Sequence, residues 1–179
     1  MAGLLKSSSY PSVPCIRDGS RVSGNGIQVG DVTEQDAAIR LFVYETVVQS
    51  GRPPSPLETA RRFGLSPIEA RLAFQRLQDE HDALVLLPGS PYIWMAEPFS
   101  AAPTDYPVHS ARMSWFGNCV WDALAIAALV GVDADIPTAC PASGAELILS
   151  VRNGRLSPIE AVVHFAVRPR DWWISLGFT

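Results

Sequence analysis

The chain has 179 residues, of which 47% are hydrophobic and 18% are charged, and its formal net charge is −4. This composition supplies enough apolar side chains for a buried core and is unlike that of a disordered chain. The negative charge argues against a protein whose main task is to bind nucleic-acid phosphates. No run of sequence approaches the roughly 20 apolar residues that a membrane-spanning helix needs. The length allows one ordinary domain, or a small helical module with a compact second domain.

The first 35 residues are rich in Ser, Gly and Pro and lack apolar periodicity, so we expect a flexible leader over residues 1–35. The leader contains no apolar stretch typical of a signal peptide. The chain has three cysteines, Cys15, Cys119 and Cys140. An odd number of cysteines without an export signal indicates reduced thiols, and the cytoplasm is the expected location.

The pattern of residues 36–99 predicts three helices followed by a β-hairpin. Ser66, Pro67 and Glu69 form the pattern of a capping box at the start of the third helix. The expected elements are a helix over about 36–50, a second from Pro56 to Phe63 ending at Gly64, a third over about 67–78, and a hairpin of 83–87 with 92–95. Three helices followed by a hairpin is the plan of a winged-helix module.

A winged-helix module can bind DNA, but its charges here do not favour that role. Residues 36–97 contain eight acidic and six basic side chains. The expected third helix carries Glu69 near its start and Asp79 and Glu80 at its end, and these carboxylates would repel phosphates. We therefore expect a structural module with no nucleic-acid partner. A winged-helix transcriptional regulator remains the alternative.

The second half of the chain predicts a small mixed α/β domain of catalytic type over residues 111–179. Residues 100–110 (SAAPTDYPVHS) are polar and contain prolines, so we expect a linker there. Further expected elements are an apolar helix from Trp121 to Val130, strands over 147–151 and 161–167 around the Asn153–Gly154 turn, and a helix opening at Asp171. The expected fold class is α+β.

Cys119 and Asp122 are the candidate reactive pair. Cys119 stands at or just before the start of the apolar helix, and Asp122 follows three residues later on the same face. A helix N-terminus stabilises a thiolate, and a carboxyl group within reach can hold or deliver a proton. Such a pair suits a reaction that binds a soft electrophile and protonates a leaving group. From spacing alone the alternative stays open that Cys119 is a small core residue and Asp122 a helix cap.

Histidines and paired cysteines do not indicate another kind of site. His81 lies in a charged loop, His109 in the expected linker and His164 in an expected strand, so none is tied to Cys119 as a base. Cys119 and Cys140 lack the paired partners of a zinc ribbon. No cofactor is expected.

Two motifs together resemble the organomercurial (alkylmercury) lyase family. The run NCVWDAL is followed about twenty residues later by TACPASG. The family shows an aromatic-rich approach to a Cys, an Asp three residues on, and then a Cys in a C-x-x-[ST]-G turn. The resemblance covers roughly residues 36–179, including the winged-helix-like module.

The resemblance implies a role for each matching residue. Cys119 matches the cysteine that attacks and binds the mercury of the substrate, Asp122 the proton-handling carboxylate, and Cys140 a cysteine regarded as structural. Residues 163–179 resemble the segment that leads into F-T-C, whose Cys is the second catalytic thiol and would follow Thr179. The chain is therefore expected to be a truncated copy or a naturally short relative.

The implied activity is protonolysis of the carbon–mercury bond of a small organomercurial, with external thiols as partners. A thiol-based protein that binds mercurials without turnover is the alternative. The sequence does not indicate an oligomeric state. Because a helix start stabilises a thiolate, Cys119 is expected to react with a limiting thiol reagent faster than Cys140.

Overall fold

The computed structural model describes residues 32–157, 160–165 and 168. The chain divides into two units, residues 27–163 and a second made of residues 1–26 with 164–179, and the account below concerns the first. The expected leader up to residue 31 and the helix expected at Asp171 lie outside the described residues.

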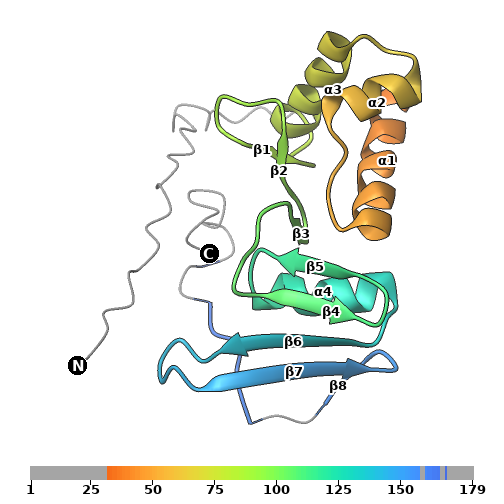
Figure 1. Cartoon of the computed structure of the whole chain (residues 1–179). Helices are drawn as coiled ribbons and strands as arrows, with labels where there is room; N and C mark the ends of the chain where they lie inside the picture. The colour runs from red at the N-terminus through yellow and green to blue at the C-terminus, as the bar shows by residue number, and fades with distance from the viewer. Residues whose placement is uncertain (1–31, 158–159, 166–167, 169–179) are drawn as a thin grey trace, which may run out of the picture. The chain divides into compact units, whose positions relative to one another are not determined.

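The described part of the chain contains helices and one antiparallel sheet, so the predicted α+β class is confirmed (Figure 1). The helices are α1 (Glu34–Ser50), α2 (Pro56–Phe63), α3 (Pro67–Asp79) and α4 (Val120–Val130). The strands are β1 (Val85–Leu86), β2 (Ile93–Ala96), β3 (Phe99–Ser100), β4 (Pro107–Ser110), β5 (Ser114–Gly117), β6 (Ala134–Ala139), β7 (Glu146–Arg152) and β8 (Arg155–Leu156).

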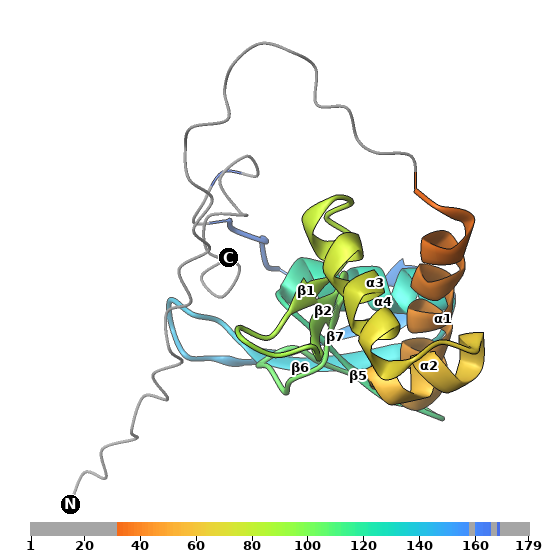
Figure 2. The ribbon, with the colours of Figure 1, turned by 90° about the horizontal axis from the view of Figure 1, so that it is seen from above.

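The three N-terminal helices begin and end where short-range hydrogen bonds satisfy their free backbone groups. Ser66 and Glu69 form the predicted capping box of α3, and Ser55 and Glu58 form a second one at α2. Gly64 ends α2 with a φ of 65°, as predicted, because glycine adopts this left-handed conformation without strain. Figure 2 shows α1, α2 and α3 side by side, and contacts join each pair of them.

The helices and the hairpin of β1 with β2 share one apolar core. Its buried side chains are Ile39, Val43, Ala73, Phe74, Leu77, Ala83, Leu84, Leu86, Ile93 and Ala96. An ion pair at its edge joins α1 to α3, since Arg76 donates to both carboxylate oxygens of Asp36 at 2.9 and 2.7 Å. Asp36 is only 1% exposed, whereas the Arg76 side chain is 38% exposed, so the carboxylate is shielded from water and the guanidinium group is only partly so. The three helices and the hairpin are present as predicted, while the winged-helix assignment stays a prediction.

All eight strands belong to one sheet in the order β1-β2-β3-β5-β4-β6-β7-β8, and every neighbouring pair is antiparallel. β3 and β4 fall partly within residues 100–110, where the polar composition predicted a linker. These short strands form because β5 pairs with both of them, Phe99 opposite Gly117 and Pro107 opposite Phe116. The boundaries of the predicted domains stay a prediction.

A second core lies between α4 and the sheet. Its buried side chains are Val47, Phe99, Val108, Trp115, Ala123, Ile126, Ala127, Ala134, Ile136, Leu149 and Val151. Val47 comes from α1, and the indole N–H of Trp115 donates to its carbonyl oxygen at 2.9 Å. This bond ties α1 to the strand that leads into α4.

Two predictions for the C-terminal strands need correction. The strand expected over 161–167 is absent from its described residues 161–165, and Val162 there is 91% exposed. The partner of β7 across the Asn153–Gly154 turn is instead the two-residue β8. β7 forms its long pairing with β6, which the sequence analysis missed. Within the described residues no helix is both long and apolar enough to cross a membrane.

Candidate functional site

Cys119 and Asp122 meet at the start of α4. Cys119 is the N-cap residue, with an extended backbone at φ −141° and ψ 179°, and Asp122 lies in the first turn. The thiol and the carboxyl group lie close enough for each to shift the pKa of the other, and both residues are partly buried. The structure thus brings together the two residues predicted as a pair.

Gly117 fixes the place of this helix start on the sheet. Its N–H donates to the carbonyl oxygen of Tyr106 at 3.0 Å, and its own carbonyl accepts the hydroxyl of Thr104 at 2.6 Å. A Cβ atom on Gly117 would stand 2.5 Å from the nitrogen of Ala123 and 3.0 Å from the carbonyl oxygen of Cys119. The first turn of α4 therefore rests directly on the Gly117 backbone.

The electrostatics of Cys119 differ from the expectation drawn from its position. Burial raises the pKa of the thiol, and the charge of Asp122 adds to this effect. The backbone N–H groups of Asp122 and Trp121 lower the pKa but only partly offset the burial. The expected stabilised thiolate is therefore wrong for the free protein, and Cys119 is held as a neutral thiol.

The carboxyl group of Asp122 also has a raised pKa. Burial raises its pKa, although Cys119 and Asn118 lower it in part. The side-chain amide of Asn118 is buried, and neither its Nδ2 nor its Oδ1 atom has a hydrogen bond of good geometry in the described part of the chain. An unsatisfied buried amide is costly, and such groups often mark a binding site.

A second carboxyl group, Glu97, stands near this site and was not singled out by the sequence analysis. It lies in the turn between β2 and β3, and continuing the pairing of Phe99 with Gly117 by two residues places it opposite Cys119. Burial raises the pKa of Glu97, and the charge of Asp122 raises it further. The nearness of Glu97 to Cys119 follows from the pairing of β3 with β5, which are distant in sequence, and no local motif indicates it.

Cys140 lies away from the first turn of α4, in the turn between β6 and β7. The turn is closed by bonds from the Cys140 N–H to the Ala145 carbonyl at 2.8 Å and from the Gly144 N–H to the Cys140 carbonyl at 2.7 Å. Hydrogen bonds with Ser143 lower the pKa of the Cys140 thiol. Cys140 belongs to neither apolar core, and Cys119 and Cys140 are both free cysteines. The structural role implied for Cys140 stays a prediction.

The histidines and metal-ligating groups add nothing to the site. His109 lies on β4 and its Nδ1 bonds with the Ser114 hydroxyl at 2.9 Å, while the Nδ1 of His81 is buried without a partner among the described residues. His164 is exposed and lies outside any strand. No cluster of three or more His, Cys, Asp or Glu residues suited to a metal ion occurs in the part of the chain that the structure describes.

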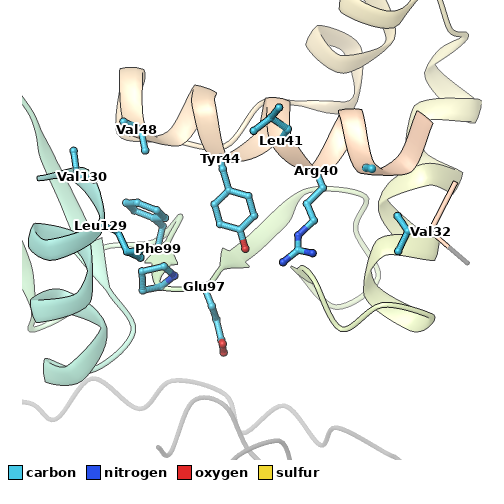
Figure 3. Close-up of a pocket in the computed structure, with 11 residues that line it drawn as sticks. Val32, Arg40, Leu41, Tyr44, Val48, Glu97, Phe99, Leu129 and Val130 are labelled. Atoms are coloured by element: carbon cyan, nitrogen blue, oxygen red, sulfur yellow. The ribbon is translucent and has the colours of Figure 1, made fainter. Parts of the chain in front are cut away.

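An open, mainly apolar cavity of about 700 Å³ lies between α1 and α4 (Figure 3). Its lining residues are Val32, Ala37, Arg40, Leu41, Tyr44, Val48, Glu97, Pro98, Phe99, Leu129 and Val130. Leu129 and Val130 are at the end of α4 opposite to Cys119. The cavity therefore adjoins the reactive pair through Glu97 and does not contain it.

Comparisons with known proteins include the segment that carries Cys119 and Asp122. Residues 99–178 match the family model of MerB, described as alkylmercury lyase. A solved structure, the mercury-bound form of MerB2, superposes with a TM-score of 0.56 at 19% sequence identity and covers 72% of this chain. The chain spans 61% of the length of that structure. No curated protein sequence matches. The predicted resemblance to the alkylmercury lyase family is thus confirmed over residues 99–178.

Proposed function

We propose that this protein is an alkylmercury lyase that cleaves the carbon–mercury bond of a small organomercurial by protonolysis. The observation that carries the proposal is the closely placed pair of Cys119 and Asp122 at the start of α4, in which each group shifts the pKa of the other. The pair lies in the segment that matches the family. No cofactor takes part, and the mercury is the substrate's own.

The first step is the capture of mercury by Cys119. The thiol sulfur bonds to the mercury of R–Hg–X, the ligand X leaves as an anion, and the thiol proton passes to the carboxylate of Asp122. A neutral thiol suits this step because binding of a soft metal itself displaces the proton from sulfur. The closeness of the two side chains gives that proton a short path.

The second step breaks the carbon–mercury bond. The carboxyl group of Asp122 gives its proton to the carbon, the hydrocarbon R–H leaves, and a mercury cation stays on the Cys119 sulfur. A general acid works best when its pKa lies near the working pH, and burial moves the pKa of Asp122 upward in that direction. External thiols, which are abundant in the cytoplasm, then remove the metal.

Residues 36–99 act in this proposal as a structural winged-helix-like module without a DNA partner. Two of its arginines are ion-paired, Arg52 with Glu58 and Arg76 with Asp36, each at 2.7 Å. These side chains are therefore less able to neutralise phosphates. The Trp115 bond to α1 supports a role in bracing the strand that leads to the site.

Binding of mercurials without cleavage is the second candidate. Among the described residues Cys119 is the one thiol in contact with Asp122, and cleavage is easier when mercury carries a second sulfur donor. Capture requires only Cys119. The two candidates therefore differ in whether hydrocarbon is released.

The test measures released hydrocarbon and retained mercury together, after incubation with a methyl- or phenylmercury salt and excess external thiol. The wild-type chain should release hydrocarbon over several turnovers. Asp122→Asn should retain the mercurial but release hydrocarbon more slowly by orders of magnitude, because it lacks the proton donor. Asp105→Asn, an exposed carboxylate next to the site, is the matched control and should behave as wild type. Cys119→Ser should lose both activities.

Stoichiometric mercury with no hydrocarbon from the wild-type chain would support the binding candidate instead. Equal retention of the mercurial by wild type and Cys119→Ser would overturn both.

A further inference from the structure

We propose that Asn118 is a positioning residue of the lyase reaction, whose side-chain amide stabilises the carboxylate that Asp122 becomes when it protonates the substrate carbon. This role rests on the proposed function, since it serves that proton transfer. The family resemblance assigns no role to Asn118, which directly precedes Cys119 in the chain.

The local fold places Asn118 against the first turn of α4. Gly117, the residue before it, lies so close to this turn that a Cβ atom there would be 2.5 Å from the Ala123 nitrogen and 2.9 Å from the Ala123 Cα. The chain therefore turns back on itself between Gly117 and Ala123. Asn118 adjoins the first of these residues and Asp122 the second, so the two are neighbours in space.

The effect of Asn118 on the Asp122 carboxyl group agrees with this placement. Burial is the largest influence and raises the pKa of Asp122, while the Cys119 side chain and backbone lower it. The side chain and the backbone of Asn118 lower the pKa as well. A neighbour lowers the pKa of a carboxyl group by stabilising its charged form. Asn118 therefore favours the carboxylate over the neutral acid.

The amide of Asn118 has unused hydrogen-bonding capacity. An asparagine side chain carries two N–H donors and a carbonyl acceptor. Both Nδ2 and Oδ1 are buried, and neither has a hydrogen-bond partner among the described residues. Leaving a buried amide unsatisfied costs free energy, and a catalytic role is one reason for which native proteins retain such a group.

The donor is needed in the step that breaks the carbon–mercury bond. After capture, the Asp122 carboxyl group holds the proton that came from the Cys119 thiol. This proton and the electron pair of the carbon–mercury bond then form the C–H bond of the hydrocarbon. The carboxyl oxygen keeps the electron pair of its O–H bond, and mercury stays as a cation on sulfur. Negative charge thus develops on a partly buried carboxyl group, with no oxidation or reduction.

A donor beside developing charge speeds a reaction because it binds the transition state more strongly than the ground state. In the captured complex Asp122 is a neutral acid, for which an N–H donor does little. In the transition state Asp122 is becoming a carboxylate, which the Asn118 amide stabilises. Hydrogen bonds of this kind are often long or poorly aligned in the free enzyme and tighten during the reaction. The unpartnered amide of the free chain agrees with this behaviour.

The experiment compares the full wild-type chain with Asn118→Leu, which keeps the size of the side chain but removes its polar atoms. Each chain is loaded with a limiting amount of phenylmercuric chloride, and released benzene and retained mercury are followed over a single turnover. Asn118→Leu should capture the mercurial as completely as wild type does. It should release benzene about 100-fold more slowly, the effect typical of removing one donor that faces developing charge.

Thermal unfolding of the free chains separates this role from a structural one. The amide bonds to no described residue, so replacing it with an apolar side chain of the same size should leave Tm unchanged or raise it. An amide that held the fold together would give a lower Tm. Ser114→Ala is the matched control, because it removes a polar group from β5 whose hydroxyl bonds with His109 at 2.9 Å. It should release benzene as wild type does.

A wild-type release rate in Asn118→Leu would overturn the role proposed for Asn118. Slow release accompanied by a lower Tm would overturn it too, because loss of structure would then explain the rate. Both results leave the proposed function standing, since the wild-type chain still cleaves the mercurial. Retained mercury without benzene from the wild-type chain would overturn the proposed function, and the role of Asn118 with it.

Discussion

Replacing Gly117 with alanine tests whether the backbone of β5 positions the reactive pair. The added Cβ would lie 2.5 Å from the Ala123 nitrogen, 2.9 Å from the Ala123 Cα and 3.0 Å from the Cys119 carbonyl oxygen. All three atoms belong to the backbone of the first turn of α4, so no side-chain rotation can relieve the contact. The helix start must move away from the sheet.

The loss of stability in Gly117→Ala can be estimated from the cost of adding a methyl group where the backbone atoms are already closely packed. Inserting a methyl group into such a place destabilises a protein by about 1–3 kcal/mol. For a chain of this length, each kcal/mol lowers Tm by roughly 2–4 °C. The displaced helix start also separates the Cys119 thiol from the Asp122 carboxyl group, so hydrocarbon release should fall more than mercurial retention.

Thermal unfolding and the two-product mercury assay measure both effects. Gly64→Ala is the matched control: its φ of 65° makes an alanine strained, and nothing lies within 4 Å of the added Cβ. It should lower stability by about 1–2 kcal/mol and leave the assay unchanged below its Tm. If Gly117→Ala kept wild-type stability and hydrocarbon release, the argument that Gly117 positions α4 would be refuted.

Three further predictions concern charged and ionisable groups. Asp36→Asn should destabilise the chain by about 2–3 kcal/mol, because it removes a charged partner of Arg76. Since the pKa of Asp36 is lowered in the fold, its contribution is present above the carboxyl group's unfolded pKa and lost as pH falls through the folded pKa, which acid titration of unfolding would show. Near neutral pH, iodoacetamide should modify Cys140 before Cys119, and the reverse order by mass mapping would contradict the pKa directions. Glu97→Gln should raise stability at neutral pH but not at acidic pH, because a raised carboxyl pKa makes the wild type less stable as pH rises; an unchanged pH dependence of urea unfolding would count against this.

Local chemistry made the N-terminal half of the fold predictable. Ser66 and Glu69 cap α3 through bonds between residues three apart, and Gly64 ends α2 through its own backbone freedom. These signals lie within one or two helical turns of sequence. The predicted helix starts and ends are present in the structure because the apolar face of each helix packs in the core with these same boundaries.

The strands were harder to predict because their stability comes from distant partners. β6 has the sequence ADIPTA, with a proline and an aspartate, and forms because β4 and β7 pair with it on either side. β4 lies in a segment whose polar composition predicted a linker. The apolar residues over 161–165 led to the opposite error, a predicted strand that the structure lacks there, because their side chains are exposed and pack on no partner strand.

The same distinction between local and distant interactions applies to the candidate site. Cys119 and Asp122 were predictable because a helix holds residues three apart on one face. Glu97 depends on the β2–β3 turn and the β3–β5 register, so no window of sequence contains it. The state of the Cys119 thiol was predicted wrongly for a related reason. Its position at a helix start is local, whereas the burial that raises its pKa comes from the tertiary fold.

A neutral thiol at Cys119 is compatible with mercury chemistry, and it changes how selectivity arises. Oxidants and ordinary alkylating agents attack the thiolate, so a raised pKa protects Cys119 from them. A soft metal displaces the thiol proton itself, and the Asp122 carboxyl group is in place to receive it. Cys140 shows the opposite arrangement, with a lowered pKa in an accessible turn. Selectivity for mercury over oxidants and alkylating agents therefore arises at Cys119, whereas Cys140 is the thiol that those reagents modify first.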